Sequence, residues 1–312
     1  MPEIIAVDRI WDKAPHNAFT DLVRFGGAWY CVFREGTGHV SLDGALRVIT
    51  SPDGVKWTSA ARIASEAADL RDAKITVTPG GSFGTLTTSK LMLAGAAALH
   101  PPADAKHQSM VWLSDGGRKW SEAVEVGDKD YWLWRVTWRE GRVYGIGYST
   151  TGTDIIRLYR SDDGQRFETL VEDLGVRGYA NESSIVFDPA GQAFCLLRRD
   201  GKPGSAMLGT AGAPYTKWAW NDLGVRIGGP HIIQLPGERF FAVVRLYDDR
   251  QRTSLCTLDV AAGRLTELLA LPSGGDTSYA GLVFHDGLLW ISYYSSHEDK
   301  TAIYLAKLAL PA

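Results

Sequence analysis

The chain has 312 residues, of which 45% are hydrophobic and 22% are charged, and its formal net charge is −3, as expected of a globular protein with a large core. It has no run of like charges and no basic stripe, so we expect no nucleic-acid partner. No apolar run approaches the roughly 18 residues of a membrane-spanning helix, so we expect no membrane association. The first residues, MPEIIAVDRIWDK, do not read as a signal peptide. We therefore expect a cytoplasmic protein, or a periplasmic or secreted one if a leader has been removed.

The three cysteines are odd in number and lie inside apolar runs, which predicts small buried side chains rather than metal ligands or nucleophiles; they are Cys31, Cys195 and Cys256. Histidine and cysteine spacings typical of zinc sites (HxH, HExxH, CxxC) do not occur. We therefore predict no metal and no cofactor.

In chain order, short runs of Val, Ile, Tyr, Phe and Trp alternate with glycine turns, which is typical of an all-β chain. The turns recur about every 46 to 60 residues, at FGGAW (25–29), PGGSF (79–83), REGRV (139–143), PAGQA (189–193), PGERF (236–240) and HDGLL (285–289). A second turn, closed by an aromatic residue, recurs at SPDGVKW (51–57), SDGGRKW (114–120) and SDDGQRF (161–167). The fourth unit keeps only a trace, APYTKWAW (213–220), and the fifth, DVAAGRL (259–265), lacks the aromatic residue.

Six units of four short strands predict a six-bladed β-propeller of four-stranded antiparallel blades, forming one domain over residues 1–312. The last unit supplies three strands, and we expect the N-terminal EIIAVDRI to add the fourth and close the ring. A pair of β-sandwiches is the alternative, but sandwich strands would not repeat a turn at this spacing.

One face of the predicted propeller carries the residues that precede the first strand and follow the second strand of each unit. Six of the seven histidines fall on this face. Trp side chains stack on sugar rings and Arg binds carboxylates in a bidentate manner, so the face suits an anionic sugar. The candidates taken from it are Arg34, His39, Arg71, Asp72, Trp134, Arg135, Glu182, Arg198, His231, Arg245, Tyr247 and Tyr279.

The three aromatic-closed turns resemble the Asp-boxes of the sialidase (neuraminidase) superfamily, and the resemblance covers nearly the whole chain. NESSIVFDPAGQAFCLLRR resembles the unit that carries the catalytic base and an arginine of the carboxylate-binding triad, which implies Glu182 and Arg198. FFAVVRLYDD is similar to the unit with another triad arginine, at Arg245. SYAGLVFHDGLLWISYY is similar to the segment with the nucleophilic tyrosine, at Tyr279.

The sequence departs from this family at the third arginine. Ala18, in HNAFTDLVRF, stands nearest the expected arginine, and Tyr294 stands near the place of the glutamate that orients it. The family's acid precedes the first box, where this chain offers His39 or Asp43, and the spacing favours His39. We therefore expect ordinary α-sialosides to be cleaved poorly or not at all.

The leading hypothesis is an exo-acting glycoside hydrolase on an anionic or unusual glycan. Tyr279 would be the nucleophile with Glu182 as its base, and His39 or Asp72 would protonate the leaving group. The substrate-binding candidates are Arg198, Arg245, Arg34, Arg71, His231, Trp134, Arg135 and Tyr247.

Two alternatives remain open at the level of the sequence. One is a polysaccharide lyase on a uronate-containing glycan, with His39 or His231, Tyr279 and an arginine. The other is a noncatalytic glycan-binding propeller. The sequence indicates a glycan partner in each case. It identifies neither the sugar, nor its linkage, nor the oligomeric state of the protein.

Overall fold

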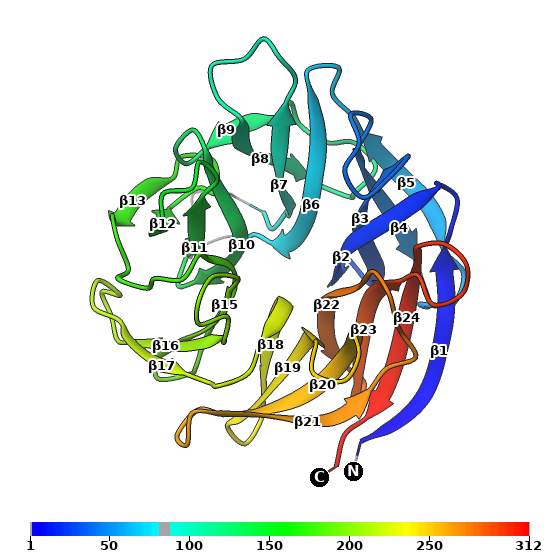
Figure 1. Cartoon of the computed structure of the whole chain (residues 1–312). Helices are drawn as coiled ribbons and strands as arrows, with labels where there is room; N and C mark the ends of the chain where they lie inside the picture. Colours follow the sequence, from blue (N-terminus) through cyan, green and yellow to red (C-terminus); the bar gives the residue numbers. More distant parts are fainter. Residues whose placement is uncertain (1, 81–87, 312) are drawn as a thin grey trace.

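The computed structural model describes residues 2–80 and 88–311, and it shows six four-stranded antiparallel sheets arranged around a central axis (Figure 1). The predicted all-β, six-bladed propeller is confirmed. Part of one predicted turn, at residues 81–83, lies outside the described residues. Among the residues that are described, none forms a helix with the length and hydropathy that crossing a membrane requires.

The first three blades follow the chain order. Blade 1 consists of β2 (His16–Phe25), β3 (Ala28–Gly36), β4 (Ala45–Ser51) and β5 (Thr58–Ile63). Blade 2 consists of β6 (Ala68–Val77), β7 (Leu91–Leu99), β8 (His107–Ser114) and β9 (Val124–Val126). Blade 3 consists of β10 (Tyr131–Arg139), β11 (Arg142–Ser149), β12 (Ile156–Ser161) and β13 (Glu168–Val171).

The next two blades repeat this order, and the last one is shared between the chain ends. Blade 4 consists of β14 (Ala180–Phe187), β15 (Ala193–Arg199), β16 (Met207–Ala211) and β17 (Ala219–Asp222). Blade 5 consists of β18 (Ile227–Leu235), β19 (Arg239–Leu246), β20 (Arg252–Asp259) and β21 (Arg264–Ala270). Blade 6 consists of β22 (Thr277–His285), β23 (Leu288–Ser295), β24 (Ala302–Ala309) and, from the N-terminus, β1 (Glu3–Trp11).

The ring is closed by β1, which pairs antiparallel with β24 and brings the two chain ends side by side (Figure 1). This confirms the strand expected from EIIAVDRI. Apolar side chains fill the spaces between neighbouring blades; Val32 and Leu46 of blade 1, for example, pack with Leu70 and Leu93 of blade 2. The core therefore lies between the blades and leaves the axis to other residues.

The recurrent Ser/Asp/Gly turns lie at the ends of β4, β8 and β12 and are closed by side-chain-to-backbone hydrogen bonds. The Gly54 N–H donates to Ser51 Oγ at 2.8 Å, and the Val55 N–H donates to Asp53 Oδ1 at 2.8 Å. A Cβ on Gly54 would lie 2.6 Å from the Trp290 ring of blade 6, so this turn also packs between blades. These bonds explain why Ser, Asp and Gly recur at the turns.

Each of the six inner strands contains an irregularity in which two residues face one residue of the second strand. This is the geometry of a β-bulge, which bends a strand and turns its side chains in a new direction. The bulged pairs are Phe19–Thr20, Asp72–Ala73, Trp134–Arg135, Asn181–Glu182, Gly229–Pro230 and Tyr279–Ala280. The bulges therefore lie near the start of every inner strand and place these residues around the axis.

Candidate functional site

Glu182, Arg198 and Tyr279 meet in a compact hydrogen-bonded group. Tyr279 Oη donates to Glu182 Oε1 at 2.6 Å. Arg198 Nη1 donates to the same carboxylate oxygen at 2.6 Å and to Tyr279 Oη at 3.0 Å. The expected contact between Glu182 and Tyr279 is thus present, although they come from blades 4 and 6. Their catalytic roles remain a prediction.

The backbone around this group explains its geometry. Tyr279 is a bulge residue with a φ of 54°, a conformation uncommon for non-glycine residues, so its ring leaves the direction of a regular strand. Gly229 lies against it, and a Cβ there would be 2.8 Å from Tyr279 Cδ2 and 3.0 Å from its Cα. The Gly229 N–H also donates to Glu182 Oε2 at 2.7 Å. Glycine at position 229 therefore allows blades 4, 5 and 6 to approach one another at the site.

The electrostatics of the pair keep the proton on the phenol in the resting state. Burial acts to raise the pKa of Glu182, but Arg198 outweighs it and brings this pKa below its usual value. Burial, together with the negative charge of Glu182, raises the pKa of Tyr279 well above its usual value. At neutral pH the resting state therefore contains a protonated phenol bound to an ionised carboxylate.

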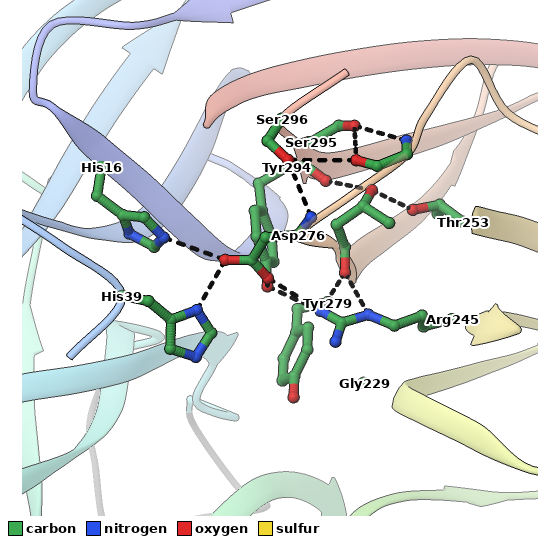
Figure 2. Close-up of polar contacts among 12 residues, drawn as sticks. His16, His39, Gly229, Arg245, Thr253, Asp276, Tyr279, Tyr294, Ser295 and Ser296 are labelled. Carbon is green, nitrogen blue, oxygen red and sulfur yellow. Dashed lines mark hydrogen bonds and ion pairs between the residues drawn. The ribbon is translucent and has the colours of Figure 1, made fainter. Parts of the chain in front are cut away.

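Arg245 also lies beside Tyr279, where it is held by hydrogen bonds to blade 6 (Figure 2). Its Nε donates to the carbonyl oxygen of Thr277 at 2.7 Å, and its Nη2 donates to Tyr294 Oη at 2.9 Å. Its guanidinium carbon is 5.2 Å from the centre of the Tyr279 ring. Arg245 is thus placed beside the predicted nucleophile.

Asp276, which the sequence analysis did not single out, joins Arg245 to two histidines (Figure 2). Tyr294 Oη donates to its Oδ1 at 2.6 Å. His39 Nδ1 and His16 Nε2 donate to its Oδ2 at 2.7 and 3.1 Å. Burial acts to raise the pKa of Asp276, but the hydrogen bonds from His16 and His39 outweigh it and hold this pKa far below its usual range. Asp276 is therefore an ionised acceptor for several donors.

His16, His39 and Asp276 are also the one group of possible metal ligands found in residues 2–80 and 88–311, with ligand atoms within 4.8 Å of one another. The surroundings do not fit a cation well. The guanidinium of Arg245 already lies 3.4 Å from Asp276. The buried Nδ1 of His16 has no described partner, whereas a metal-bound imidazole usually donates its second N–H to an acceptor. We therefore assign no metal to this cluster.

Asp72 and Lys74 approach the site from β6, and both are buried, with 5% and 3% of their surface exposed. Neither Asp72 Oδ1 nor Lys74 Nζ has a hydrogen-bond partner among the described residues. Burial raises the pKa of Asp72, opposed by the positive charge of Lys74. Burial lowers the pKa of Lys74 to about 8, opposed by Asp72. The sequence analysis named Asp72 but missed Lys74.

Two predicted substrate-binding arginines lie beside the site but are engaged elsewhere. Arg34 has no exposed surface, and its Nε donates to Asp69 at 2.9 Å while its Nη1 donates to the carbonyl oxygen of Gly38 at 2.8 Å. Arg71 lies 3.4 Å from Asp69 and donates to the carbonyl oxygen of His39 at 3.2 Å. Arg34 therefore braces the loop that carries His39, and its predicted contact with substrate does not fit its burial.

The alternative acid Asp43 lies on that same loop but turns away from the histidine cluster. Its carboxylate accepts from the Thr37 N–H at 3.1 Å and from the Thr37 hydroxyl at 3.0 Å. These bonds, with one from Ser41 that contributes most, lower the pKa of Asp43 to about 2. Asp43 thus shapes the loop, and it is a poor proton donor at neutral pH.

Arg135 and His231 belong to a buried brace on the propeller axis. Arg135 Nη1 donates to Asp21 Oδ2 at 2.8 Å, and its Nη2 donates to the carbonyl oxygen of Ala280 at 3.3 Å. His231 Nδ1 donates to the same carbonyl at 2.9 Å, and burial lowers the pKa of His231 to about 3. Asp21 also accepts from the Ile75 N–H at 2.9 Å. This arrangement joins several blades. The lowered pKa makes His231 a weak base, which does not favour the role considered for it in a lyase.

The two aromatic candidates differ in their surroundings. Trp134 is 3% exposed, and its ring centre lies 5.9 Å from that of Tyr279, so it supports the tyrosine and does not offer an open stacking surface. Tyr247 is half-buried, and the guanidinium carbons of Arg226 and Arg245 lie 4.4 and 5.9 Å from its ring centre. Tyr247 is therefore the better placed of the two to contact a ligand.

Two of the residues that the sequence analysis missed share one signal. Asp21 and Lys74 are charged residues inside apolar strands, HNAFTDLVRF and ADLRDAKITV, where a simple strand would place apolar side chains. Such positions need a partner or a function. Asp276, in contrast, precedes β22 in a polar segment and offers no comparable signal.

A separate groove of about 490 Å³ lies on the outside of the ring between blades 1 and 2. Its lining includes Ile63, Leu70, Trp112 and Trp120. None of the predicted site residues lines it, so it is not part of the candidate site.

The comparisons with solved structures agree with the observed fold. A Dyadobacter fermentans protein described as of unknown function superposes with a TM-score of 0.83 at 18% identity, over 99% of both chains. A Penicillium chrysogenum alpha-L-arabinanase, solved with arabinobiose, has a TM-score of 0.76 at 14% identity and covers 97% of this chain and 98% of its own. A Trypanosoma rangeli sialidase has a TM-score of 0.71 at 12% identity and covers 94% of this chain but 55% of its own.

No protein-family model matches the sequence, and no curated protein matches it either. At identities below one fifth, the three structures show a shared fold and leave the activity open. The chain is therefore similar in architecture both to an arabinanase and to a sialidase.

Proposed function

We propose that the protein is a retaining glycoside hydrolase that acts on a terminal sugar of a glycan. The observation that carries the proposal is the 2.6 Å hydrogen bond from the Tyr279 phenol to Glu182 at the centre of the ring. Tyr279 and Glu182 are 8% and 6% exposed, so the site suits the end of a glycan better than its middle. Folds shared with an arabinanase and a sialidase support carbohydrate chemistry.

In the first step, Tyr279 Oη attacks the anomeric carbon and transfers its proton to Glu182 Oε1. The bond from the anomeric carbon to the leaving oxygen breaks, and that oxygen receives a proton from an acid. A phenol with a raised pKa is a weak nucleophile and needs such a base. Arg198, which contacts both side chains, stabilises the phenolate character that develops on Tyr279.

His39 is our choice for the acid. Its Nδ1 donates to Asp276 at 2.7 Å, which fixes the ring so that Nε2 points away from Asp276 (Figure 2). Half of its side chain is exposed, as a contact with a departing group requires. The Phe19 ring lies between His39 and Tyr279, with both centre-to-centre distances 5.1 Å. Asp72 is the second candidate for this role, because burial raises its pKa.

In the second step, His39 removes a proton from water, and the water oxygen attacks the anomeric carbon of the tyrosyl-linked sugar. The tyrosyl–sugar bond breaks, and Tyr279 recovers its proton from Glu182. Two inversions leave the anomeric configuration unchanged. The sequence of proton transfers returns every group to its starting state.

The decisive experiment is incubation of the purified protein with a panel of neutral, uronate-containing and sialylated oligosaccharides, followed by mass analysis. We expect release of a terminal sugar with a mass gain of one water, and poor cleavage of α-sialosides. Tyr279→Phe should reduce turnover roughly a thousandfold or more while the circular dichroism spectrum stays unchanged. Retained turnover in that variant would remove the tyrosine from the mechanism.

The same panel separates the alternatives. Products that lack the added water and absorb near 235 nm would indicate a lyase. Binding without turnover in the wild-type protein would indicate a noncatalytic glycan-binding propeller. Efficient release of sialic acid would show that another group replaces the arginine that is absent at Ala18.

A further inference from the structure

Two buried ionisable groups beside Tyr279 have no partner among the described residues. Asp72 is the first residue of the bulge in β6, with a φ of 52°, and Lys74 follows the bulge. Asp72 Oδ1 and Lys74 Nζ are both buried without a hydrogen bond within the described chain. A buried polar group without a partner destabilises the folded state, most of all when it is charged, so each such group in a folded protein calls for an explanation.

The direction of Lys74 points to a ligand. Its Nζ lies 4.9 Å from the centre of the Trp134 ring and 5.8 Å from the centre of the Tyr279 ring. The ammonium group is therefore held beside the proposed nucleophile by aromatic faces, which attract a cation but do not accept a directed hydrogen bond from it. Its three N–H donors make no hydrogen bond to any described residue.

The other cations around the centre already have carboxylate partners. The guanidinium–carboxylate pairs are Arg34–Asp69, Arg71–Asp69, Arg135–Asp21, Arg198–Glu182, Arg198–Asp200 and Arg245–Asp276. Asp72 and Lys74 are the main charged neighbours of one another, but no ion pair within 4.0 Å joins them. A ligand that contacts both Asp72 and Lys74 would give these two groups the hydrogen-bond partners that they lack within the described chain.

We propose that Lys74 and Asp72 bind neighbouring hydroxyl groups of the sugar that reacts at Tyr279, and that this sugar is neutral. The proposal rests on the proposed function for the identity of the reacting sugar. A sugar hydroxyl accepts a hydrogen bond from an ammonium and donates one to a carboxylate, so a vicinal diol satisfies both side chains. A carboxylate on the sugar would accept from Lys74, but it would also place a second negative charge beside Asp72 and Glu182.

The test measures binding apart from turnover. Tyr279→Phe serves as the host, because it keeps the ring and removes the nucleophilic oxygen. Its binding is measured by saturation-transfer NMR and by calorimetric titration with matched pairs of sugars. The probes are L-arabinose, D-xylose, D-galactose, D-glucose, D-galacturonate, D-glucuronate and N-acetylneuraminate. D-Galactose and D-galacturonate differ only by oxidation at one carbon, so that pair isolates the effect of charge.

Lys74→Met and Asp72→Asn are then introduced into the host, and Lys56→Met, an exposed lysine, is the matched control. We expect at least one neutral sugar to bind more tightly than its uronate partner. Its dissociation constant should rise tenfold or more in both site variants and stay unchanged in the control. Tighter binding of the uronates, or unchanged binding in Lys74→Met, would overturn the proposal, as would a panel in which nothing binds.

A second measurement separates a ligand-binding pair from a structural one. Without ligand, the melting temperatures of Lys74→Met and Asp72→Asn should equal or exceed that of the host, because each removes an unpaired buried group. If both single variants lose stability and the double variant recovers it, the two groups form a structural pair and the proposal fails. If neutral sugars bind as expected but the wild-type protein hydrolyses nothing, the hydrolase proposal fails and this one stands.

Discussion

Asp276 shows how a single residue organises the candidate site. Here Tyr294 Oη donates to Asp276, and Asp276 in turn accepts from His39. The Phe19 ring packs against this group, with its centre 5.3 Å from that of Tyr294 and 5.1 Å from that of His39. Tyr294, Asp276 and Phe19 thus fix the position of His39.

The two acid candidates can be separated by the leaving group. A general acid matters most when the departing oxygen is basic, and little when it leaves readily as an aryl oxide. We expect His39→Ala to lower kcat/KM by about a hundredfold or more on alkyl glycosides and far less on nitrophenyl glycosides. Asp72→Asn should lower both by similar factors, because it weakens binding. The measurement is kcat/KM over a leaving-group series, and the reverse pattern would assign the acid role to Asp72.

Lys74 also predicts a pH dependence of stability. Burial brings its pKa from 10.5 to about 8, so the folded state releases this proton before the unfolded state does. The resulting penalty on folding is fully present below pH 8, shrinks as the pH rises, and disappears above the unfolded pKa; it amounts to roughly 3 kcal/mol. Denaturant titrations at pH 7 and pH 10.5 should show Lys74→Met more stable than wild type at pH 7, with the difference shrinking at pH 10.5. A difference that does not change with pH would contradict the assigned burial penalty.

At the residue scale, the sequence predicted the contact between Glu182 and Tyr279 because a family pattern placed both at inner-strand starts. It did not predict that Arg34 would donate its hydrogen bonds to Asp69 and to the carbonyl oxygen of Gly38. Those contacts depend on how the loop that carries Gly38 folds back over the arginine. Asp276 was missed for the same reason. Contacts between residues of different blades depend on how the blades pack. The alternation of apolar and polar residues along one strand does not reveal that packing.

At the scale of elements, the bulges of the inner strands decide which side chains reach the axis. Strand alternation in the sequence predicts a regular strand, whereas each inner strand contains one extra residue near its start. The turns were predicted well, because Ser, Asp and Gly act through their own backbone neighbours. The bulges were not predicted, because SYAG and GGPH read as ordinary strand and turn residues.

Gly229 provides a test of this element-level geometry. In Gly229→Ala the Cβ would meet Tyr279 at 2.8 Å, and the residue has a φ of 56°. We expect a loss of stability of about 1–3 kcal/mol and a decrease in kcat of at least about tenfold, because Tyr279 shifts from Glu182. Gly224→Ala is the control, since its φ is 68° but no atom lies within 4 Å of the added Cβ. Equal activity losses in both variants would mean that backbone strain alone explains the effect.

At the scale of the whole molecule, the repeat spacing predicted six blades and the N-terminal strand completed the last one. The number of blades could be predicted because turns and apolar runs are local features that recur at a nearly regular spacing along the sequence. The chain is also expected to unfold as one domain, which stays a prediction. Closure of the ring matters for the site, because Tyr279 lies on the inner strand of the blade that β1 completes.

Removal of residues 1–11 tests this closure. The deletion exposes the edge of β24 and uncovers apolar contacts of Ile4 and Val7, so we expect a lower melting temperature and concentration-dependent association through the free edge. A synthetic peptide of residues 2–13 should restore the melting temperature and the monodisperse profile in light scattering, and a scrambled peptide should not. If activity is present in the intact chain, the peptide should restore it in parallel, because β24 supports β23 and β23 supports the strand that carries Tyr279. An unchanged melting temperature in the truncated chain would show that five complete blades and three strands hold the ring without this closure.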